Sequence, residues 1–366
     1  MKMLKFPPEI QQHFPSNTLS VHKFIALNLP SCAPAATTRL ARANSYVSGL
    51  QQTVDNVNET ILLLSPSDDI LTTIQQSMRS GIVKSILCPH SPTANSQRYP
   101  LWLASFWFQL SAIRKIQKKW FMAIRNLELR MNQDPESIPL RQAFNALSHI
   151  PWTGQLQGFH DTIELEKLST YFTQEWLSDD HELVMLSSLK QDIHAVGRGD
   201  SFIENTAFML LLGNAYQDQV DQQTYMTERC YEWLRDRGNE LAMGEKRYLS
   251  TIANQDGVHW VAIILDFDQR KILYGDPYGN RISAEHHTII NWWTEHHTGV
   301  HFTLHDLPIR RQVDNFSCGI LSWNSLRLHY GLVSEFESLM DPFECRAEVF
   351  LHLTDYYHKD KVSSNI

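Results

Sequence analysis

The sequence predicts an α+β domain in the second half of the chain, preceded by a mostly α-helical region. Three short apolar runs between residues 248 and 274, separated by polar or turn residues, are typical of strands. Segments with apolar residues three or four apart flank these runs and predict helices. The first half carries only the helical pattern, and a chain of 366 residues is long enough for two domains.

The composition is that of a globular protein with a buried core, since 43% of the residues are hydrophobic and 20% are charged. The formal net charge of -8 disfavours a chain built to coat nucleic acid. Residues 1–16 lack an apolar run of signal-peptide length, and the runs 61–64 and 207–212 are too short to span a bilayer. We therefore expect an intracellular protein of the nucleus or cytoplasm, with neither a membrane nor a nucleic-acid partner.

The cysteines are odd in number, widely spaced and without a Cys-x-x-Cys pair. They are Cys32, Cys88, Cys230, Cys318 and Cys345. This usage fits a reducing compartment, and it fits neither a disulfide framework nor a zinc knuckle.

A histidine-rich stretch near the C-terminal third raises the alternative of a metal site. Its members are His286, His287, His296, His297, His301 and His305. Metal binding favours two histidines four residues apart on one helical face. The nearest such pair, His297 and His301, straddles Gly299, a residue that commonly ends helices. We expect no metal ion and no other cofactor.

The first half divides into segments by periodicity and proline content. Residues 1–40 carry several prolines and predict an irregular segment. Residues 43–64 and 70–86 show helical spacing, and the polar stretch 88–100 predicts a loop. The longest predicted helix spans 101–131, where large apolar residues form one stripe.

The helix at 101–131 also carries a dense set of basic residues. They are Arg114, Lys115, Lys118, Lys119 and Arg125. A nucleic-acid-binding helix is one interpretation, and a solvated face opposite a buried stripe is the other. We favour the solvated face because the chain as a whole is acidic. The sequence identifies no partner for this region.

Beyond the prolines and glycines of residues 151–158 the pattern changes to mixed helix and strand. Helices are predicted at 183–192, 203–216, 284–297 and 317–330, and strands at 248–253, 260–265, 271–274 and 300–304.

The strands at 260–265 and 271–274 predict a hairpin, with the turn at residues 266–269. His259 opens the first strand and Asp276 closes the second. Adjacent antiparallel strands bring the start of one beside the end of the other. His259 and Asp276 should therefore be neighbours, as a general base and the carboxylate that orients it must be.

Cys318 lies where a loop enters the predicted helix at 317–330. A helix N-terminus favours a thiolate over a thiol because its free N–H groups carry partial positive charge. Ser317 is expected to cap this helix with its hydroxyl. The side-chain amide of Gln312 and the backbone N–H of Cys318 are expected to stabilise the oxyanion of a tetrahedral intermediate.

The order His259-Trp260, Asp276, Gln312 and Ser317-Cys318-Gly319 resembles the ubiquitin-like-protein-specific proteases, the SUMO-deconjugating family related to the adenovirus protease. That family pattern is His-Trp, an Asp about seventeen residues later, and Gln-x-Asn-x-x-Asp-Cys-Gly. The resemblance extends over residues 175–352. This sequence departs from the pattern at Pro277, at Asp314 in place of Asn, and at Ser317 in place of Asp.

The resemblance implies a papain-like or adenain-like domain with a central mixed sheet flanked by helices. The implied organisation is an irregular segment at 1–40, a helical domain at 41–150, a linker at 151–172, the catalytic domain at 173–357 and a tail at 358–366.

The resemblance also implies roles for two tryptophans. Trp176 opens a Trp-Leu-Ser-Asp segment similar to one that begins such domains, and Trp260 follows His259. In the family the equivalent side chains wall a tunnel that admits only the Gly-Gly tail of the modifier. The same is expected of Trp176 and Trp260, whereas the alternative for both is a place in the core.

The resemblance predicts a cysteine isopeptidase that acts on a ubiquitin-like modifier or its conjugates, most simply a SUMO-like one, with Cys318, His259 and Asp276 as triad. Two other functions stay open. An acetyltransferase could use a similar His, acidic residue and Cys. A module that binds modifiers without cutting them, or a transposon-derived one, would not need the four catalytic groups.

Overall fold

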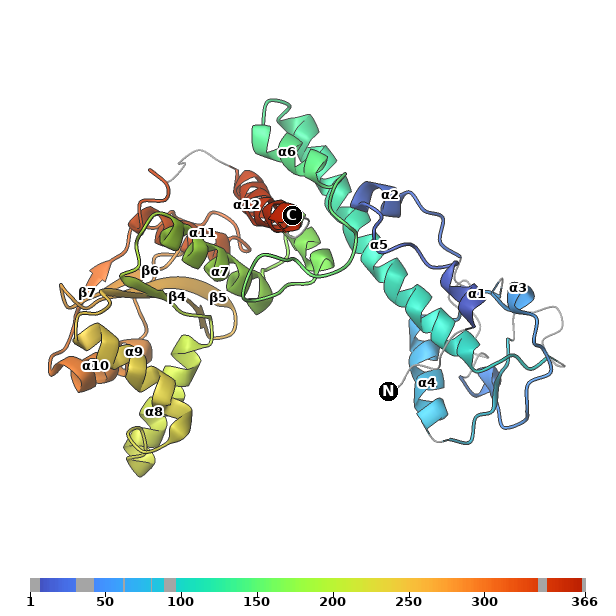
Figure 1. The fold of residues 1–366 in the computed structure, drawn as a ribbon, viewed down its shortest axis with the longest axis horizontal. Helices are drawn as coiled ribbons and strands as arrows, with labels where there is room; N and C mark the ends of the chain where they lie inside the picture. The colour runs from blue at the N-terminus through green and yellow to red at the C-terminus, as the bar shows by residue number, and fades with distance from the viewer. Residues whose placement is uncertain are drawn as a thin grey trace. The chain divides into compact units, whose positions relative to one another are not determined.

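The computed structural model describes residues 7–30, 43–61, 63–79, 81–88, 97–334 and 341–363, and its ribbon is drawn in Figure 1. The chain divides into two compact units, Met1–Met122 with Leu147–Trp152 and Ala123–Ala146 with Thr153–Ile366. The contacts therefore group residues 123–146 with the second unit, whereas the sequence pattern places them in a helical region at 41–150. No helix of the described residues is long and apolar enough to cross a membrane.

The first unit is built from short elements and the start of one long helix. These are α1 (Pro8–Gln11), α2 (Val21–Ile25), η1 (Ala43–Tyr46), β1 (Val47–Ser48), α3 (Val57–Thr60), α4 (Asp68–Arg79), β2 (Ser85–Ile86) and α5 (Trp102–Gln133).

Two expectations for this unit were wrong. Residues 43–64 do not form one helix, because Val47 and Ser48 pair with Ile86 and Ser85 in an antiparallel ladder. The helix expected at 70–86 ends at Arg79 and is followed by β2 of that ladder. The predicted loop at 88–100 lies partly outside the described residues.

The long helix α5 confirms the prediction at 101–131. The start of its apolar stripe is buried in the first unit, where Phe106, Trp107 and Leu110 belong to the core. On the polar side, the Lys115 ammonium lies 2.9 Å from the Asp68 carboxylate, and Arg114 donates to the Ser65 hydroxyl.

The second unit contains a five-stranded sheet and the helices that cover it. The elements are α6 (Ile138–Ala146), η2 (Leu165–Phe172), α7 (Asp179–Ala195), β3 (Ser201–Ile203), α8 (Phe208–Gln222), η3 (Arg229–Tyr231), α9 (Glu232–Ala242), β4 (Tyr248–Gln255), β5 (His259–Asp266), β6 (Lys271–Gly275), α10 (Ala284–Thr298), β7 (Thr303–Asp306), α11 (Cys318–His329) and α12 (Pro342–Ser363).

The sheet has the order β3-β4-β5-β6-β7. The central pairs β4–β5 and β5–β6 are antiparallel, while the two edge pairs are parallel, so the sheet is mixed. Every residue of β5 is buried because helices cover both faces of the sheet. Figure 1 shows α8, α9 and α10 on one side and α7 and α11 on the other.

Most second-half elements confirm the prediction, including the strands expected at 248–253, 260–265 and 271–274. The strand expected at 300–304 begins three residues later, because β7 pairs with β6 from Thr303 onward. The helix expected at 203–216 begins at Phe208, because Ser201–Ile203 joins the sheet beside β4. Helices α6, α9 and α12 were not predicted.

Candidate active site

The hairpin of β5 and β6 places His259 beside Asp276. The register pairs Ala262 with Gly275, so the residue that opens β5 lies near the residue that follows β6. The His259 Nε2 atom is 2.7 Å from Asp276 Oδ1, and both side chains are buried. The prediction that these two residues are neighbours is confirmed.

This pair shifts the pKa values of both members. Burial lowers the pKa of the His259 imidazole, but the hydrogen bond with Asp276, the proximity of Cys318 and the charges of both outweigh it and raise the value to about 9. Burial raises the pKa of Asp276, yet hydrogen bonds from His259 and from the Tyr278 N–H, with the imidazolium charge, hold it below its ordinary value. Both shifts favour the imidazolium form of His259 and the carboxylate form of Asp276.

Cys318 is the first residue of α11 and is buried. Its thiol interacts electrostatically with the His259 side chain. Nε2 of that ring is bonded to Asp276, whereas Nδ1 is buried and makes no hydrogen bond, so Nδ1 is the atom available to sulfur. The thiol thus lies at a helix N-terminus and beside an imidazole whose pKa is raised, two features that favour a thiolate.

The loop before α11 is organised by Asp314. Its Oδ1 atom accepts from the backbone N–H groups of Phe316 (2.8 Å) and Ser317 (2.9 Å). The Ser317 hydroxyl donates to Asp314 Oδ2 at 2.7 Å and makes no cap bond to α11. The expectation that Ser317 caps this helix with its side chain was wrong, because Asp314 engages the hydroxyl.

Gln312 lies in the same loop with a partly buried side chain. Its amide Nε2 atom donates to Asp314 Oδ1 at 3.2 Å and to the Tyr278 hydroxyl at 3.4 Å. Its backbone N–H donates to the Pro277 carbonyl at 2.9 Å. Gln312 is thereby tied to the turn that follows Asp276.

A narrow pocket of about 180 Å³ lies against Cys318. Its lining residues are Trp176, Leu177, Ser178, Asp179, Asn254, Gly257, Val258, Trp260 and Cys318. Trp176 is 51% exposed, whereas Trp260 is 5% exposed and donates its indole N–H to the Leu177 carbonyl at 3.2 Å. The structure therefore brings both predicted tryptophans and Cys318 to one pocket.

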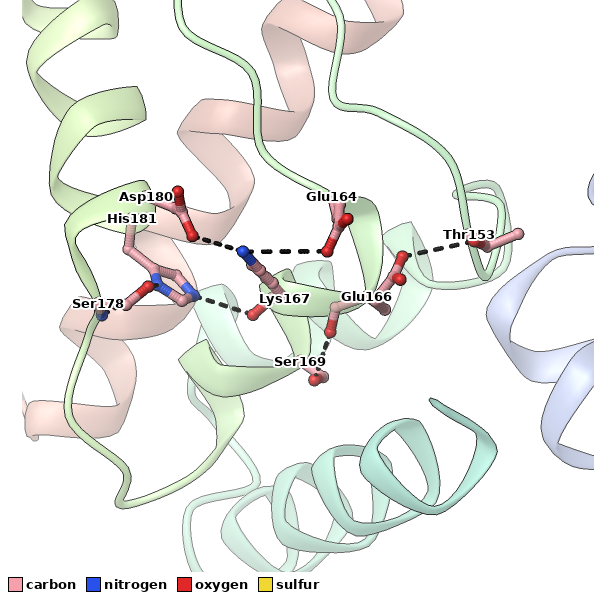
Figure 2. Close-up of polar contacts among 8 residues, drawn as sticks. All are labelled: Thr153, Glu164, Glu166, Lys167, Ser169, Ser178, Asp180 and His181. Atoms are coloured by element: carbon pink, nitrogen blue, oxygen red, sulfur yellow. Dashed lines mark hydrogen bonds and ion pairs between the residues drawn. The ribbon is translucent and has the colours of Figure 1, made fainter. Parts of the chain in front are cut away.

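Ser178 of the pocket wall precedes α7 and contacts His181 in the first turn of that helix (Figure 2). The His181 Nδ1 atom accepts from the Ser178 N–H at 3.2 Å, and its Nε2 faces the Lys167 carbonyl at 3.0 Å. The Lys167 ammonium pairs with Asp180. Burial lowers the pKa of His181 to about 4, so its ring is neutral and can accept at Nδ1.

Two residues near Cys318 were not predicted. The Tyr278 ring stacks on His259, with ring centroids 4.7 Å apart. The Glu182 carboxyl is fully buried against Gly319, where it occupies the space that an added Cβ would need. Burial and then the Cys318 charge raise the pKa of Glu182 well above its ordinary value. The sequence carries no signal for either contact, because both depend on how separate elements pack.

The histidine-rich stretch lies mainly on and after α10. His297 is held by the Tyr225 hydroxyl at 3.0 Å and by Asn239 Oδ1 at 3.1 Å. Burial lowers its pKa to about 4, as is typical of a neutral core histidine. Within the described ranges, no group of three or more histidine, cysteine or acidic side chains has a metal-binding arrangement.

The comparison with family models matches residues 175–339 to the Ulp1 protease family, C-terminal catalytic domain. This match confirms the expected family for residues 175–339, and the mixed sheet flanked by helices confirms the expected fold class. A search of the curated proteins found no match.

Several solved structures are similar to this chain. The C-terminal Ulp1 protease domain in complex with Smt3, the yeast ortholog of SUMO, is 18% identical, covers 59% of this chain and 94% of its own, and has a TM-score of 0.42. The Chaetomium thermophilum Ulp1-like SUMO protease catalytic domain is 10% identical. The match covers 52% of this chain and 78% of that domain, with a TM-score of 0.39. The Xanthomonas campestris effector XopD bound to ubiquitin is 18% identical. The match covers 50% of this chain and 92% of the XopD chain, with a TM-score of 0.32.

Proposed function

We propose that the Ulp1-family cysteine protease domain at residues 175–339 cleaves after the C-terminal Gly-Gly of a ubiquitin-like modifier, with Cys318 as nucleophile. The observation that carries this proposal is the contact chain Cys318–His259–Asp276 beside a narrow pocket walled by Trp176 and Trp260. A SUMO-like modifier is the first candidate substrate, and ubiquitin is the second.

The proton chemistry follows from which ring nitrogen each partner contacts. Asp276 accepts from Nε2–H, so the neutral ring of His259 would carry its lone pair on Nδ1, toward Cys318. The thiol proton then moves to Nδ1 and leaves a thiolate beside an imidazolium. Asp276 holds the ring in this orientation and stabilises its positive charge.

The reaction is acyl transfer from the modifier to the enzyme and then to water. The thiolate attacks the carbonyl carbon of the terminal glycine, and the oxyanion is stabilised by the Cys318 backbone N–H and the Gln312 amide. The His259 imidazolium gives its proton to the departing lysine amine, which leaves a thioester. His259 then takes a proton from water, whose oxygen attacks the thioester carbon. The carbon–sulfur bond breaks, the modifier leaves with a free carboxylate, and the His259 imidazolium shares its proton with the Cys318 sulfur again.

The preference for Gly-Gly is steric in this proposal. A pocket of about 180 Å³ leaves little room for side chains next to the reacting carbonyl. The indole of Trp260 is buried and bonded to Leu177, so a bulkier tail would have to displace a fixed wall.

A panel of modifier–fluorophore substrates tests the proposal, with SUMO-type and ubiquitin-type tails compared on the full chain. Turnover of at least one Gly-Gly substrate is expected, and Cys318→Ala should abolish it without unfolding the protein. A modifier vinyl-sulfone probe should label Cys318, with the exposed Cys230 as internal control. Turnover that survives Cys318→Ala, or labelling only at another cysteine, would exclude the proposed nucleophile.

A further inference from the structure

The Tyr278 side chain covers one face of the His259 ring. The two ring planes are inclined by only 19° at a centroid distance of 4.7 Å, which is a stacked arrangement. Tyr278 is nevertheless 47% exposed, so no core surrounds it. Its ring is a surface feature placed directly on the base.

The backbone of the turn holds this position without help from the Tyr278 side chain. The Tyr278 N–H donates to Asp276 Oδ1 at 2.7 Å, and the Gly279 N–H donates to the Asp276 carbonyl at 2.8 Å. Gly279 has φ +75°, and the Arg311 guanidinium occupies the space where a Cβ would lie. A change of the Tyr278 side chain therefore leaves the turn and its bond to Asp276 in place.

The Tyr278 hydroxyl faces the other half of the site. It accepts from Gln312 Nε2 at 3.4 Å, while the same amide donates to Asp314 Oδ1 at 3.2 Å. These two contacts fix the rotamer of the amide. The 3.4 Å bond is long, so an oxyanion can displace the hydroxyl when charge develops.

We infer that Tyr278 is a positioning residue for both halves of the reaction centre: its ring holds the His259 imidazole between Asp276 and Cys318, and its hydroxyl holds the Gln312 amide ready for the oxyanion. The Gln312 half rests on the proposed function, whereas the His259 half does not. An aromatic face also attracts a cation, which favours the imidazolium of the thiolate–imidazolium pair.

Other charged groups bear on the Cys318–His259 pair from several elements. They are Asp276 after β6, Glu182 in α7 and Arg346 in α12. A substitution at Tyr278 removes none of them. A change in the pH dependence of thiol reactivity in such a variant therefore reports on the Tyr278 ring.

The test compares Tyr278→Phe, which removes only the hydroxyl, with Tyr278→Leu, which also removes the ring. Val313→Ala is the matched control, since Val313 is next to Gln312 in the chain and 83% exposed. Three quantities are measured on the full chain: the melting temperature, kcat and KM on a cleaved modifier substrate, and the rate of Cys318 alkylation by iodoacetamide across the acidic to alkaline range.

Tyr278→Phe should lower kcat about tenfold, less than loss of an oxyanion donor itself, with KM and the alkylation profile unchanged. Adding Gln312→Ala to Tyr278→Phe should cost no more than Gln312→Ala alone, because both changes act on one amide. Tyr278→Leu should in addition move the midpoint of the alkylation profile up by roughly half a pH unit. Val313→Ala should match the wild type in all three measurements.

Wild-type kcat in Tyr278→Phe overturns the role of the hydroxyl, and an unmoved alkylation midpoint in folded Tyr278→Leu overturns the role of the ring. If Tyr278→Leu melts early, Tyr278→Phe with its Gln312→Ala partner still decides the hydroxyl half. Failure of the proposed function has a different signature, namely a wild-type protein that cuts no modifier substrate. Alkylation of Cys318 needs no substrate and would still report on the ring.

Discussion

Asp314 and Ser317 are two departures from the family pattern in the loop before the nucleophile. The pattern has Asn and then Asp before the nucleophile, whereas this chain has an acidic residue first and a hydroxyl second. The structure pairs them directly, with the Ser317 hydroxyl donating to Asp314 Oδ2 at 2.7 Å. The Asp314 carboxylate therefore orders the loop before Cys318 by accepting from the Phe316 and Ser317 N–H groups and from the Ser317 hydroxyl.

Gln312→Ala tests the oxyanion donor at the scale of a single residue. The change should lower kcat by about two to three orders of magnitude and leave KM within about twofold, because the lost bond strengthens only as charge develops. The assay is steady-state cleavage of a modifier–fluorophore substrate. A Gln312→Ala enzyme with the kcat of Val313→Ala would mean that Gln312 is only a loop residue.

At the scale of elements, the pocket beside Cys318 is a joint product of β5 and the chain that enters α7. Trp260 comes from the buried central strand, and Trp176 lies three residues before α7. Their burial differs accordingly, because β5 is covered on both faces while the entry to α7 runs along the surface. Trp260 is therefore a fixed wall of the pocket.

Trp260→Ala separates a wall of the pocket from a plain core residue. We expect slower cleavage of Gly-Gly tails and a smaller rate difference between Gly-Gly and Ala-Ala tails, since misplacement by about an ångström can cost roughly a hundredfold. A plain core residue would instead lose about 3–5 kcal/mol of stability with selectivity intact. Rates and melting temperature are measured on the same variant.

The matched control for this experiment is Trp323→Ala. Trp323 is buried in α11 and donates its indole N–H to the Met185 carbonyl at 2.7 Å, away from the residues that line the pocket. This variant should lose stability and keep its preference for Gly-Gly. If Trp260→Ala behaves in the same way, the wall assignment is wrong.

The cap of α7 makes the stability of the chain sensitive to acid. The pKa of His181 is about 4 in the folded protein and about 6.5 in an unfolded chain, because burial disfavours the charged ring. The stability that this neutral ring provides is present above pH 6.5 and is lost as the pH falls toward 4. The loss from one such group is at most about 3 kcal/mol.

Urea unfolding at a series of pH values from neutral down to about 4 measures this loss. His181→Gln should have a shallower pH dependence than the wild type, because a glutamine at this position can accept from the Ser178 N–H without titrating. His297 has a similarly lowered pKa and stays unchanged in this variant, so part of the dependence should remain. Identical pH slopes in both proteins would show that His181 does not titrate in this range.

At the scale of the whole molecule, residues 123–146 belong to the unit that holds the catalytic domain. Helix α6 packs on α12, and the Ser137 hydroxyl bonds the Glu344 carboxylate. The Arg130 guanidinium lies 4.0 Å from the centre of the Phe343 ring. We therefore propose that the folding unit of the protease begins near residue 123, upstream of the expected boundary at 173.

Two truncations test this boundary. A fragment of residues 123–366 should melt as cooperatively as the full chain and keep its kcat, because it retains α6 and the last turns of α5. A fragment of residues 153–366 should melt at a lower temperature, since it exposes the surface of α12 that α6 covers. Calorimetry and the fluorophore assay measure both fragments. Equal melting temperatures would place the boundary after α6.

The predictable part of the site lies within local patterns. The pairing of His259 with Asp276 follows from strand periodicity and a short turn, and the position of Cys318 follows from a loop before an apolar helix. The same rules failed at 43–64 and 203–208, where short strands pair with partners tens of residues away. Periodicity describes which face a residue takes, but it carries no information on a distant partner.

The sequence by itself determined the order and spacing of His259, Asp276, Gln312 and Cys318, because helix and strand periods and tight turns act over a few residues. Only the tertiary structure decided that Tyr278 covers His259, that His181 contacts the Lys167 carbonyl, and that Glu182 lies beneath Gly319. These contacts join separate elements of the fold, such as α7 and α11. Their formation depends on how whole helices and strands pack, which is a property of the complete core.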